Sequence, residues 1–302
     1  MEPIDVLRAD PLAFAVVAGL LGLLIGSFLN VVIHRLPRMM EREWRAECAD
    51  FIGANPGDAT DVADAAPAAR YNLIEPRSAC PACGAQIRAR DNIPVLSWLV
   101  LRGRCAACRA PIPVRYPIVE LATGIVSATV AWHFGWGFEA ACGLLLSWYL
   151  IAMTGIDIDT QLLPDSLTLP LLWAGLLAAA FHGRGGATIP VDLTSAVLGA
   201  AFGYLSLWSV YHAFRLATGK EGMGYGDFKL LGALGAWLGW QELVPVVLLS
   251  AATGAVVGIG LIVFRRHGRE VPIPFGPYLA AAGWLVMLWA PTLVAPWWPL
   301  GR

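Results

Sequence analysis

The chain alternates long apolar stretches with short polar ones, apart from one long polar segment near its start. Apolar runs of roughly 17–25 residues are what an α-helix needs to cross a bilayer. The sixth such run is short, which suits a tilted or partly re-entrant helix. We therefore predict an all-α polytopic membrane protein with about eight transmembrane helices, at 11–33, 117–134, 140–156, 167–182, 193–214, 228–240, 243–264 and 274–296.

The first apolar run has the length of a membrane span rather than of a cleaved signal. A signal peptide has an apolar region of about 7–15 residues after a basic start. Here the run is longer, its start carries the acidic residues Glu2, Asp5 and Asp10, and basic residues follow it. We assign residues 1–33 to a retained first transmembrane helix.

Composition supports a chain surrounded by lipid. Hydrophobic residues make up 57% of it and charged residues only 14%, whereas soluble domains carry about 25% charged residues. The formal net charge is −1. The chain therefore lacks the basic field that nucleic-acid binding requires, and membrane lipid is the expected environment.

Basic residues are distributed unevenly between the loops. If the polar segment 34–116 is cytoplasmic, the loops at 157–166, 215–227 and 265–273 are cytoplasmic as well. Counting Lys229 at the edge of a span, that side then carries 18 of the 21 Lys and Arg residues. Cytoplasmic loops are enriched in Lys and Arg, so this orientation is the expected one. The opposite side keeps Arg8, Arg184 and Arg302.

The polar segment contains two CxxC pairs. Cys80 and Cys83 form the first pair, and Cys105 and Cys108 form the second. Two such pairs with a short spacer are typical of a structural zinc site with four thiolate ligands. A catalytic zinc is not expected, because four thiolates leave no open position. Free or redox-active thiols are the alternative. We predict a small cytoplasmic zinc-binding domain inserted after the first helix, at 34–116.

The middle of the polar segment carries no recognisable chemistry. Residues 41–69 are rich in Ala, Asp and Gly and are expected to be loosely ordered. Acidic residues such as Glu41, Glu43 or Glu75 could attract a basic ligand, but a solvated loop is the preferred explanation. We assign this stretch no role.

Two aspartates fall at the edges of predicted spans. Asp157 ends the third span and Asp227 opens the sixth, so the predicted topology places both at the cytoplasmic edge. Carboxylates at membrane depth are energetically costly and are usually functional. Two that meet can share one proton, with one activating water and the other polarising a carbonyl, as in an aspartic peptidase. A structural polar pair or an ion-binding pair is the alternative.

Glycines 222, 224 and 226 precede Asp227 and allow the backbone to approach a neighbour closely. Two further aspartates are explained without catalysis. Asp159 is interpreted as a loop residue, and Asp165 as the start of a helix after Pro164.

At these residues the chain resembles the type IV prepilin peptidases, also called type IV leader peptidases, which are membrane aspartic peptidases of the GxGD type. The resemblance covers nearly the whole chain and includes both CxxC pairs. Its other motifs are Gly26–Pro37 (GSFLNVVIHRLP), Arg115–Leu121 (RYPIVEL), Ile156–Asp165 (IDIDTQLLPD), Lys220–Lys229 (KEGMGYGDFK) and Pro272–Tyr278 (PIPFGPY).

The resemblance implies a bifunctional enzyme of the bacterial inner membrane. Such enzymes cleave the basic leader of prepilins and pseudopilins after a glycine, at the cytoplasmic face. They then methylate the new amine, usually of phenylalanine, with S-adenosylmethionine. Carried over by motif, the catalytic aspartates are Asp157 and Asp227 in a peptidase domain at 117–302. The methyltransferase part falls in 34–116, with Gly103 as the candidate cofactor-binding residue.

Two other classes of function remain open from the residues alone. A transporter or ion channel would use the aspartate pair as a proton or cation site. A membrane-anchored zinc-ribbon scaffold without catalytic activity would need neither aspartate.

Overall fold

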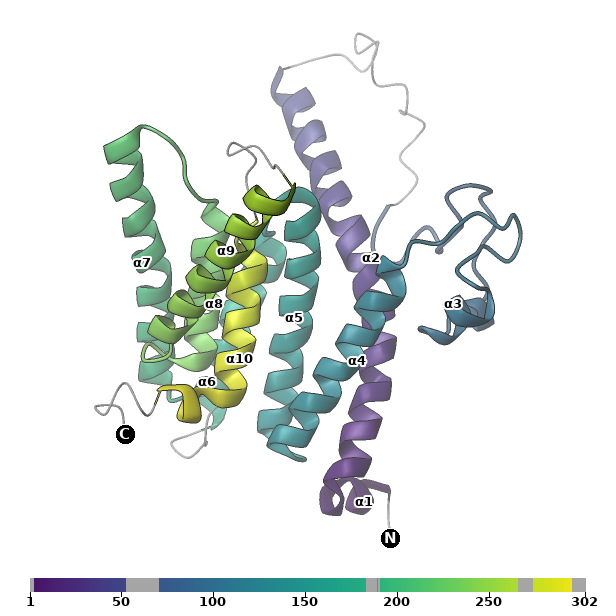
Figure 1. Ribbon diagram of the computed structural model, residues 1–302, viewed down its shortest axis with the longest axis horizontal. Helices are drawn as coiled ribbons and strands as arrows, with labels where there is room; N and C mark the ends of the chain where they lie inside the picture. The colour runs from purple at the N-terminus through teal and green to yellow at the C-terminus, as the bar shows by residue number, and fades with distance from the viewer. Residues whose placement is uncertain (1–2, 53–70, 183–188, 190, 266–273, 295–302) are drawn as a thin grey trace. The chain divides into compact units, whose positions relative to one another are not determined.

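A computed structural model describes residues 3–52, 71–182, 189, 191–265 and 274–294, and in these residues the regular structure is helical with no strand (Figure 1). Two isolated β-bridges occur in the segment between α2 and α4. The helices are α1 (Pro3–Ala9), α2 (Pro11–Ile52), the 3-10 helix η1 (Ala89–Asn92), α3 (Leu96–Val100), α4 (Arg115–Phe134), α5 (Phe138–Thr160), α6 (Asp165–His182), α7 (Leu193–Thr218), α8 (Tyr225–Leu238), α9 (Leu243–Arg265) and α10 (Gly276–Val294).

The apolar helices make this chain a multi-pass membrane protein. Each predicted span is occupied by a helix over its described residues. Among the described residues, five helices are long and apolar enough to cross a membrane: Pro11–Phe51, Arg115–Phe134, Phe138–Thr160, Leu193–Thr218 and Leu243–Leu261. Two shorter apolar helices, Asp165–Phe181 and Gly276–Trp289, accompany them. Helix α8 has 14 residues, in agreement with the short sixth span of the prediction.

Helix α2 extends much further than its apolar run. It continues through Pro37 to Ile52, a total of 42 residues. The expectation of loose order is therefore wrong for residues 41–52, and 53–69 lies outside the described residues. The physical reason is that Glu, Arg, Trp and Ala follow one another here without Gly or a second Pro, and most of them favour a helix. Glu41 and Arg45 lie one helical turn apart, and the 2.6 Å ion pair between them further stabilises the helix.

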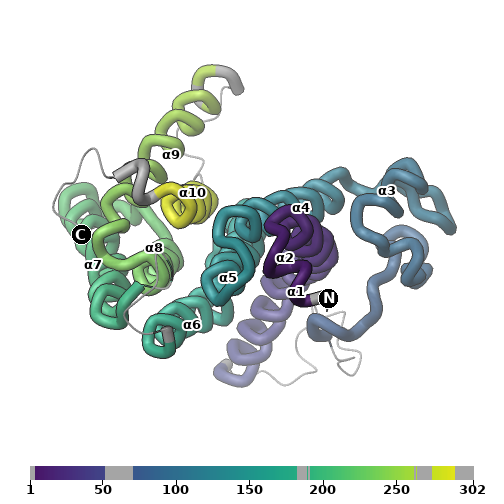
Figure 2. The backbone as a smooth tube through the Cα atoms, turned by 90° about the horizontal axis from the view of Figure 1, so that it is seen from below, coloured from purple at the N-terminus to yellow at the C-terminus, as the bar shows by residue number. Residues whose placement is uncertain are grey.

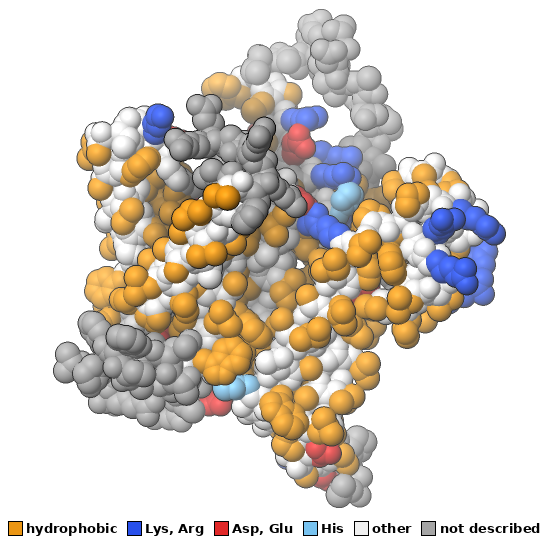
Figure 3. Space-filling model, in the orientation of Figure 1, with side chains coloured by type: hydrophobic (Ala, Val, Ile, Leu, Met, Phe, Trp, Pro, Cys, Tyr) orange, Lys and Arg blue, Asp and Glu red, His pale blue; other side chains and the backbone are white. Residues whose placement is uncertain are grey.

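The chain divides into two compact units, and the divisions fall inside α2 and α4 rather than at helix ends. The larger unit comprises Met1–Leu20 and Ile125–Arg302, and the smaller unit comprises Leu21–Gly124. Within the larger unit, helices α5 to α10 run alternately in opposite directions (Figure 1). Their exposed faces carry many large hydrophobic side chains (Figure 3), as expected of surfaces that contact lipid.

Helix α8 is the centre of the larger unit. It packs against α6, α7, α9 and α10 and is enclosed by them in the view along the helices (Figure 2). Nearly all of its side chains are buried, including Phe228 and Trp237. The indole of Trp237 donates to the carbonyl of Leu171 on α6 at 2.9 Å. A helix buried on all sides positions the residues of its first turn firmly.

Small residues bring α7 and α8 into backbone contact. A Cβ atom built on Gly199 would overlap the carbonyl of Gly235, and one on Gly235 would overlap the carbonyl of Gly199. One turn further along, a Cβ on Gly203 would lie 2.5 Å from the Leu231 carbonyl oxygen. Close approach through glycines is a common way for membrane helices to associate.

The substitution Gly199→Ala should destabilise the larger unit by about 1–3 kcal/mol, because its methyl group has no space at the α7–α8 contact. The measurement is thermal unfolding of the detergent-solubilised protein. Gly260→Ala on α9 is the matched control, since a Cβ there meets nothing within 4 Å. An unchanged Tm for Gly199→Ala would contradict this packing.

Candidate functional site

The two predicted aspartates come together inside the larger unit. Asp157 lies in the last turn of α5, and Asp227 lies in the first turn of α8. Asp157 is 4% exposed and Asp227 is 7% exposed. Both lie where the end of α5 and the starts of α8 and α10 meet. Residues 70 positions apart in sequence thus form one buried acidic pair.

A third helix contributes to the pair. The backbone N–H of Gly276 donates to Oδ2 of Asp157 at 2.9 Å. Gly276 is the first residue of α10, and the N-terminus of a helix favours negative charge. This bond fixes one carboxylate oxygen of Asp157 and leaves the other for different partners.

Leucine 163 lies between the two aspartates' helices. A Cβ built on Gly226 would lie 2.6 Å from Cβ of Leu163, and one on Gly276 would lie 3.2 Å from its Cδ1. A Cβ on Gly276 would also lie 2.6 Å from Oδ2 of Asp157. Glycine is therefore required at both positions by close approach, and the ends of α5, α8 and α10 converge on one point.

This arrangement can carry acid–base chemistry on a water molecule. Two neighbouring carboxylates removed from bulk water do not both ionise easily, so such a pair can share one proton. The ionised member can then take a proton from water while the protonated member donates to a carbonyl oxygen.

The four predicted cysteines gather in the smaller unit. The Sγ atoms of Cys80, Cys83, Cys105 and Cys108 all lie within 4.8 Å of one another. Tetrahedral zinc with Zn–S bonds of about 2.3 Å places neighbouring sulfur atoms about 3.8 Å apart. The Sγ atoms of Cys80 and Cys108 are 3.8 Å apart. The cluster therefore fits a tetrahedral metal ion with four thiolate ligands.

Each CxxC pair is held by the same backbone pattern. In the first, the N–H of Gly84 donates to the carbonyl of Cys80 at 2.9 Å, and the N–H of Cys80 donates to the carbonyl of Ala85 at 2.9 Å. In the second, Arg109 donates to Cys105 at 3.0 Å. Gly84 and Arg109 both have positive φ, 70° and 59°. The two turns are thus alike, although only the first places a glycine at the left-handed position.

The thiols of the cluster influence one another's ionisation. Backbone N–H groups of Cys108 and Ala107 donate to Cys105 and lower the pKa of its thiol to about 6. At Cys108 the N–H of Ala110 favours the thiolate, but the neighbouring cysteines outweigh it, Cys83 most of all, and raise its pKa to about 11. A metal ion among the four sulfur atoms would favour the thiolate form of each cysteine.

Comparison with known proteins gives two domain matches and several full-length relatives. The bacterial peptidase A24 N-terminal domain matches residues 20–134, and the type IV leader peptidase family matches residues 144–259. A Stutzerimonas stutzeri protein named prepilin leader peptidase/N-methyltransferase is 52% identical over 100% of both chains. Proteins of the same name from Pseudomonas aeruginosa and Aeromonas hydrophila are 54% and 59% identical, covering 96% and 91% of this chain and 95% and 90% of theirs.

This chain belongs to the type IV leader peptidase family. No solved structure matches it. The family assignment confirms the resemblance predicted from the motifs. The cysteine cluster lies within the match to the N-terminal domain, and both aspartates lie within the match to the leader peptidase family. Gly276 lies beyond the second match.

The two further aspartates of the IDIDTQLLPD motif, Asp159 and Asp165, do not belong to the buried acidic pair. Asp159 lies in α5, two residues beyond Asp157, so its assignment to a loop is wrong; its side chain is exposed. Asp165 begins α6, as predicted. It also accepts two hydrogen bonds from Nζ of Lys229 on α8, at 2.6 and 2.7 Å. This ion pair was not predicted, although opposite charges beside two span edges were a possible signal for it.

Sequence reasoning also missed the contribution of α10. Gly276 and Leu163 both lie within the motifs of the family resemblance, but the sequence predicts no contact of either residue with the aspartates. The available signal was the glycine between two prolines directly before an apolar run, which is typical of a helix start that presents free N–H groups.

The backbone conformation and close packing at position 103 explain why this residue is a glycine. It follows α3 with φ of 66°, and a Cβ there would lie 2.8 Å from Cζ2 of Trp98. Its N–H donates to the carbonyl of Trp98 at 2.8 Å, and its carbonyl accepts from Ile112 at 2.7 Å. A cofactor role for Gly103 stays a prediction.

A buried polar contact joins the cysteine-bearing segment to α4 in the smaller unit. The carboxylate of Glu120 is buried and accepts the N–H of Val95 at 2.8 Å. Asn30 on α2 donates to the carbonyl of Tyr116 at 3.1 Å. Gly26 allows α2 to approach, since a Cβ there would lie 2.7 Å from Cα of Glu120. Glu120 therefore has a structural role in this unit.

The substitution Gly276→Ala should reduce leader cleavage about a hundredfold, because its methyl group would displace the Asp157 carboxylate, and a misplacement of about 1 Å can cost that much. The measurement is the rate of leader removal from a purified prepilin. Gly260→Ala is again the control, with no change expected. A Gly276→Ala variant with full activity would show that the α10 contact does not position Asp157.

Proposed function

We propose that this chain removes the basic leader of prepilins and pseudopilins and then methylates the new N-terminal amine with S-adenosylmethionine. Asp157 and Asp227 are the proposed catalytic residues. One carboxylate activates the attacking water, and the other protonates the oxygen of the scissile carbonyl. The single observation that carries the proposal is the burial of both carboxylates where the end of α5 and the starts of α8 and α10 meet around Leu163.

The depth of the pair suits the substrate class. A prepilin has a basic leader followed by a long apolar helix, so its scissile bond lies where water and lipid meet. The proposed orientation, with the aspartates and the cysteine cluster facing the cytoplasm, is supported by the 18 of 21 Lys and Arg residues assigned to that side. The leader then remains in the cytoplasm while the apolar helix stays in the inner membrane.

The cysteine cluster is proposed to hold a structural zinc ion. Its four thiolates would close the coordination shell, so the ion would stabilise the turns around it without binding substrate. The methyltransferase activity is supported by the printed names of relatives that align over nearly the whole chain. We propose that this activity resides in 34–116, the segment that carries the cluster.

The proposal is tested by mass spectrometry of a prepilin incubated with the purified protein. Without S-adenosylmethionine, the expected product is the mature chain lacking its leader. With the methyl donor, the expected product is heavier by one methyl group. A prepilin that remains uncut under both conditions would contradict the peptidase assignment and favour a transporter that uses the aspartates for ions.

A further inference from the structure

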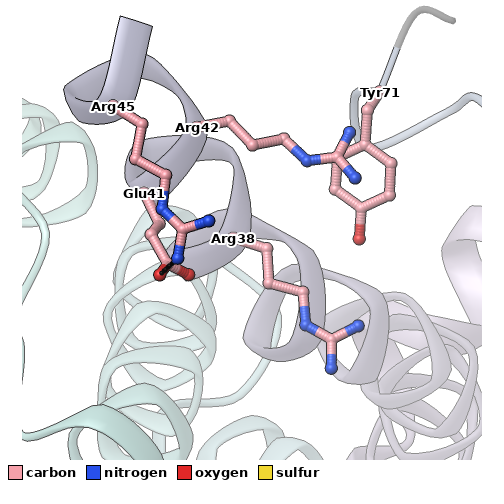
Figure 4. Close-up of a pocket in the computed structure, with 5 residues that line it drawn as sticks. All are labelled: Arg38, Glu41, Arg42, Arg45 and Tyr71. Carbon is pink, nitrogen blue, oxygen red and sulfur yellow. Dashed lines mark hydrogen bonds and ion pairs between the residues drawn. The ribbon is translucent and has the colours of Figure 1, made fainter. Parts of the chain in front are cut away.

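The part of α2 beyond its apolar run carries a basic face. Arg38, Arg42 and Arg45 are separated by four and three residues, so their side chains fall on one side of the helix. Together with Glu41 and Tyr71 they line a cavity of about 290 Å³ (Figure 4). This cavity is not used by the proposed reaction.

The charges around this cavity favour an anion. The lining contains three guanidinium groups and one carboxylate, so its net formal charge is +2. Figure 4 shows that the carboxylate of Glu41 meets Arg45, and the two atoms lie 2.6 Å apart. Arg38 contacts Nε2 of His34 at 2.8 Å and makes no ion pair with Glu41. Two of the three guanidinium groups therefore keep their charge without an acidic partner in the lining.

Tyr71 fixes the cavity's far wall. The Cζ atom of Arg42 lies 4.1 Å from the centre of the Tyr71 ring. A guanidinium stacked on a ring keeps its in-plane N–H groups available for an anion. The segment that begins at Tyr71 is held to α2 by Arg35, which donates to the carbonyls of Asn72 at 2.9 Å and Pro76 at 2.7 Å. The stacking partner is thus anchored before any ligand binds.

The basic face begins at the level of a lipid headgroup layer, with Arg38, and continues beyond it. The apolar run ends at Ile33, and at about 1.5 Å per residue Arg38 follows about 7 Å later and Arg45 about 18 Å later. The polar layer on each side of a bilayer core is about 5–8 Å thick. Helical side chains lean toward the N-terminus, so Arg42 and Arg45 extend back toward that layer.

The ligands of the proposed reaction do not suit this cavity. S-adenosylmethionine carries a sulfonium and an ammonium against one carboxylate, and a prepilin leader is basic. Both would be repelled by the net positive lining. Guanidinium groups bind phosphate oxygens through paired hydrogen bonds, and phosphate is the anion that an anionic membrane surface supplies.

We infer that the cavity lined by Arg38, Arg42, Arg45 and Tyr71 binds the phosphodiester of an anionic phospholipid from the leaflet around this end of α2. The stacked guanidinium of Arg42 and the neighbouring Arg38 hold the phosphate oxygens, while Arg45 stays paired with Glu41. The inference does not rest on the catalytic proposal, because it uses only the membrane-spanning character of α2 and the lining of the cavity.

The test is native mass spectrometry of the full chain in detergent, titrated with phosphatidylglycerol or with phosphatidylcholine of the same acyl chains. The double variant Arg38→Gln/Arg42→Gln removes two charges from the cavity. Each arginine near an anionic headgroup contributes about a fivefold factor, so the Kd for phosphatidylglycerol should rise about 25-fold. Arg88→Gln, an exposed arginine outside the cavity, is the matched control and should leave the Kd unchanged.

Further measurements in the same experiment distinguish an anionic phospholipid from other ligands of the cavity. Phosphatidylcholine should bind the wild type and the double variant equally weakly, because its choline group cancels the phosphate charge. The single variant Arg42→Lys should bind phosphatidylglycerol more weakly than the wild type but more tightly than the double variant. Lysine keeps the charge but lacks the flat guanidinium face against Tyr71. Equal phosphatidylglycerol binding by the wild type and the double variant would overturn the inference. So would saturable binding of inorganic phosphate at submillimolar concentration, which would indicate a soluble ligand.

Discussion

The substitutions Asp157→Asn and Asp227→Asn should each reduce the rate of leader cleavage by at least about a thousandfold. An amide neither accepts a proton from water nor carries the shared proton, so the acid–base pair is lost with either change. The side chains keep their size, and the protein should still fold and insert. The measurement is leader removal from a purified prepilin, followed over time by gel mobility and mass.

Asp159→Asn is the matched control, because Asp159 lies two residues from Asp157 and is exposed. It should retain cleavage within a few-fold of the unchanged protein. Thermal unfolding of all three variants reports whether any of them is misfolded. If Asp157→Asn or Asp227→Asn folded normally and cut at full rate, the acidic pair would have to be assigned a structural role.

The second large effect is expected at the cysteine cluster. Cys105→Ser removes one of four thiolates from a site that fits zinc, and it should lower zinc affinity at least about a hundredfold. Zinc binding contributes about 10–16 kcal/mol to small domains of this kind, so the surrounding turns should lose their order. The measurement is zinc content by elemental analysis, together with hydrogen exchange at the amides of Cys80 and Gly84.

Cys48→Ser is the control for this prediction. Cys48 is an exposed cysteine on α2 and does not belong to the cluster. It should leave one zinc ion per chain and an unchanged exchange pattern. A purified protein without zinc, or a Cys105→Ser variant with full zinc content, would contradict the assignment. Exchange of the α8 amides should be the same in both variants, because the cluster belongs to the other unit.

The sequence predicted the membrane helices well, because the length of an apolar run is dictated by the bilayer. It did not predict that α2 continues to Ile52. That extension is built from polar residues with high helix propensity, and no hydrophobic signal marks it. The composition of residues 41–52 was therefore interpreted as loose order, when local propensity and the Glu41–Arg45 pair favoured a helix.

The positions of the aspartates followed from topology, since both were predicted at span edges on the same face. The helix that completes their surroundings could not be found in this way. The N–H of Gly276 reaches Asp157 only because α5 and α10 pack together, and packing partners are not encoded in span order. The same limit applies to the ion pair between Asp165 and Lys229, whose members come from two different helices.

The cysteine cluster could be predicted from the sequence only in part. The CxxC spacing predicted that the four cysteines would gather, and they do so because each turn is local. The geometry adds that Arg109 occupies the left-handed position that Gly84 occupies in the other turn. Nothing in the spacing alone indicated that difference, since the backbone angle is set by the hydrogen bonds around each pair.

The central claim is that Asp157 and Asp227 act on one water molecule. It is tested most directly by the structure of the protein with a peptide analogue whose hydroxyl group replaces that water. Each carboxylate should accept or donate a hydrogen bond to the hydroxyl at about 2.6–3.2 Å, which places the nearest oxygens of the two carboxylates within about 6 Å. An analogue bound away from the pair, or carboxylates too far apart for one hydroxyl to bridge, would contradict the account.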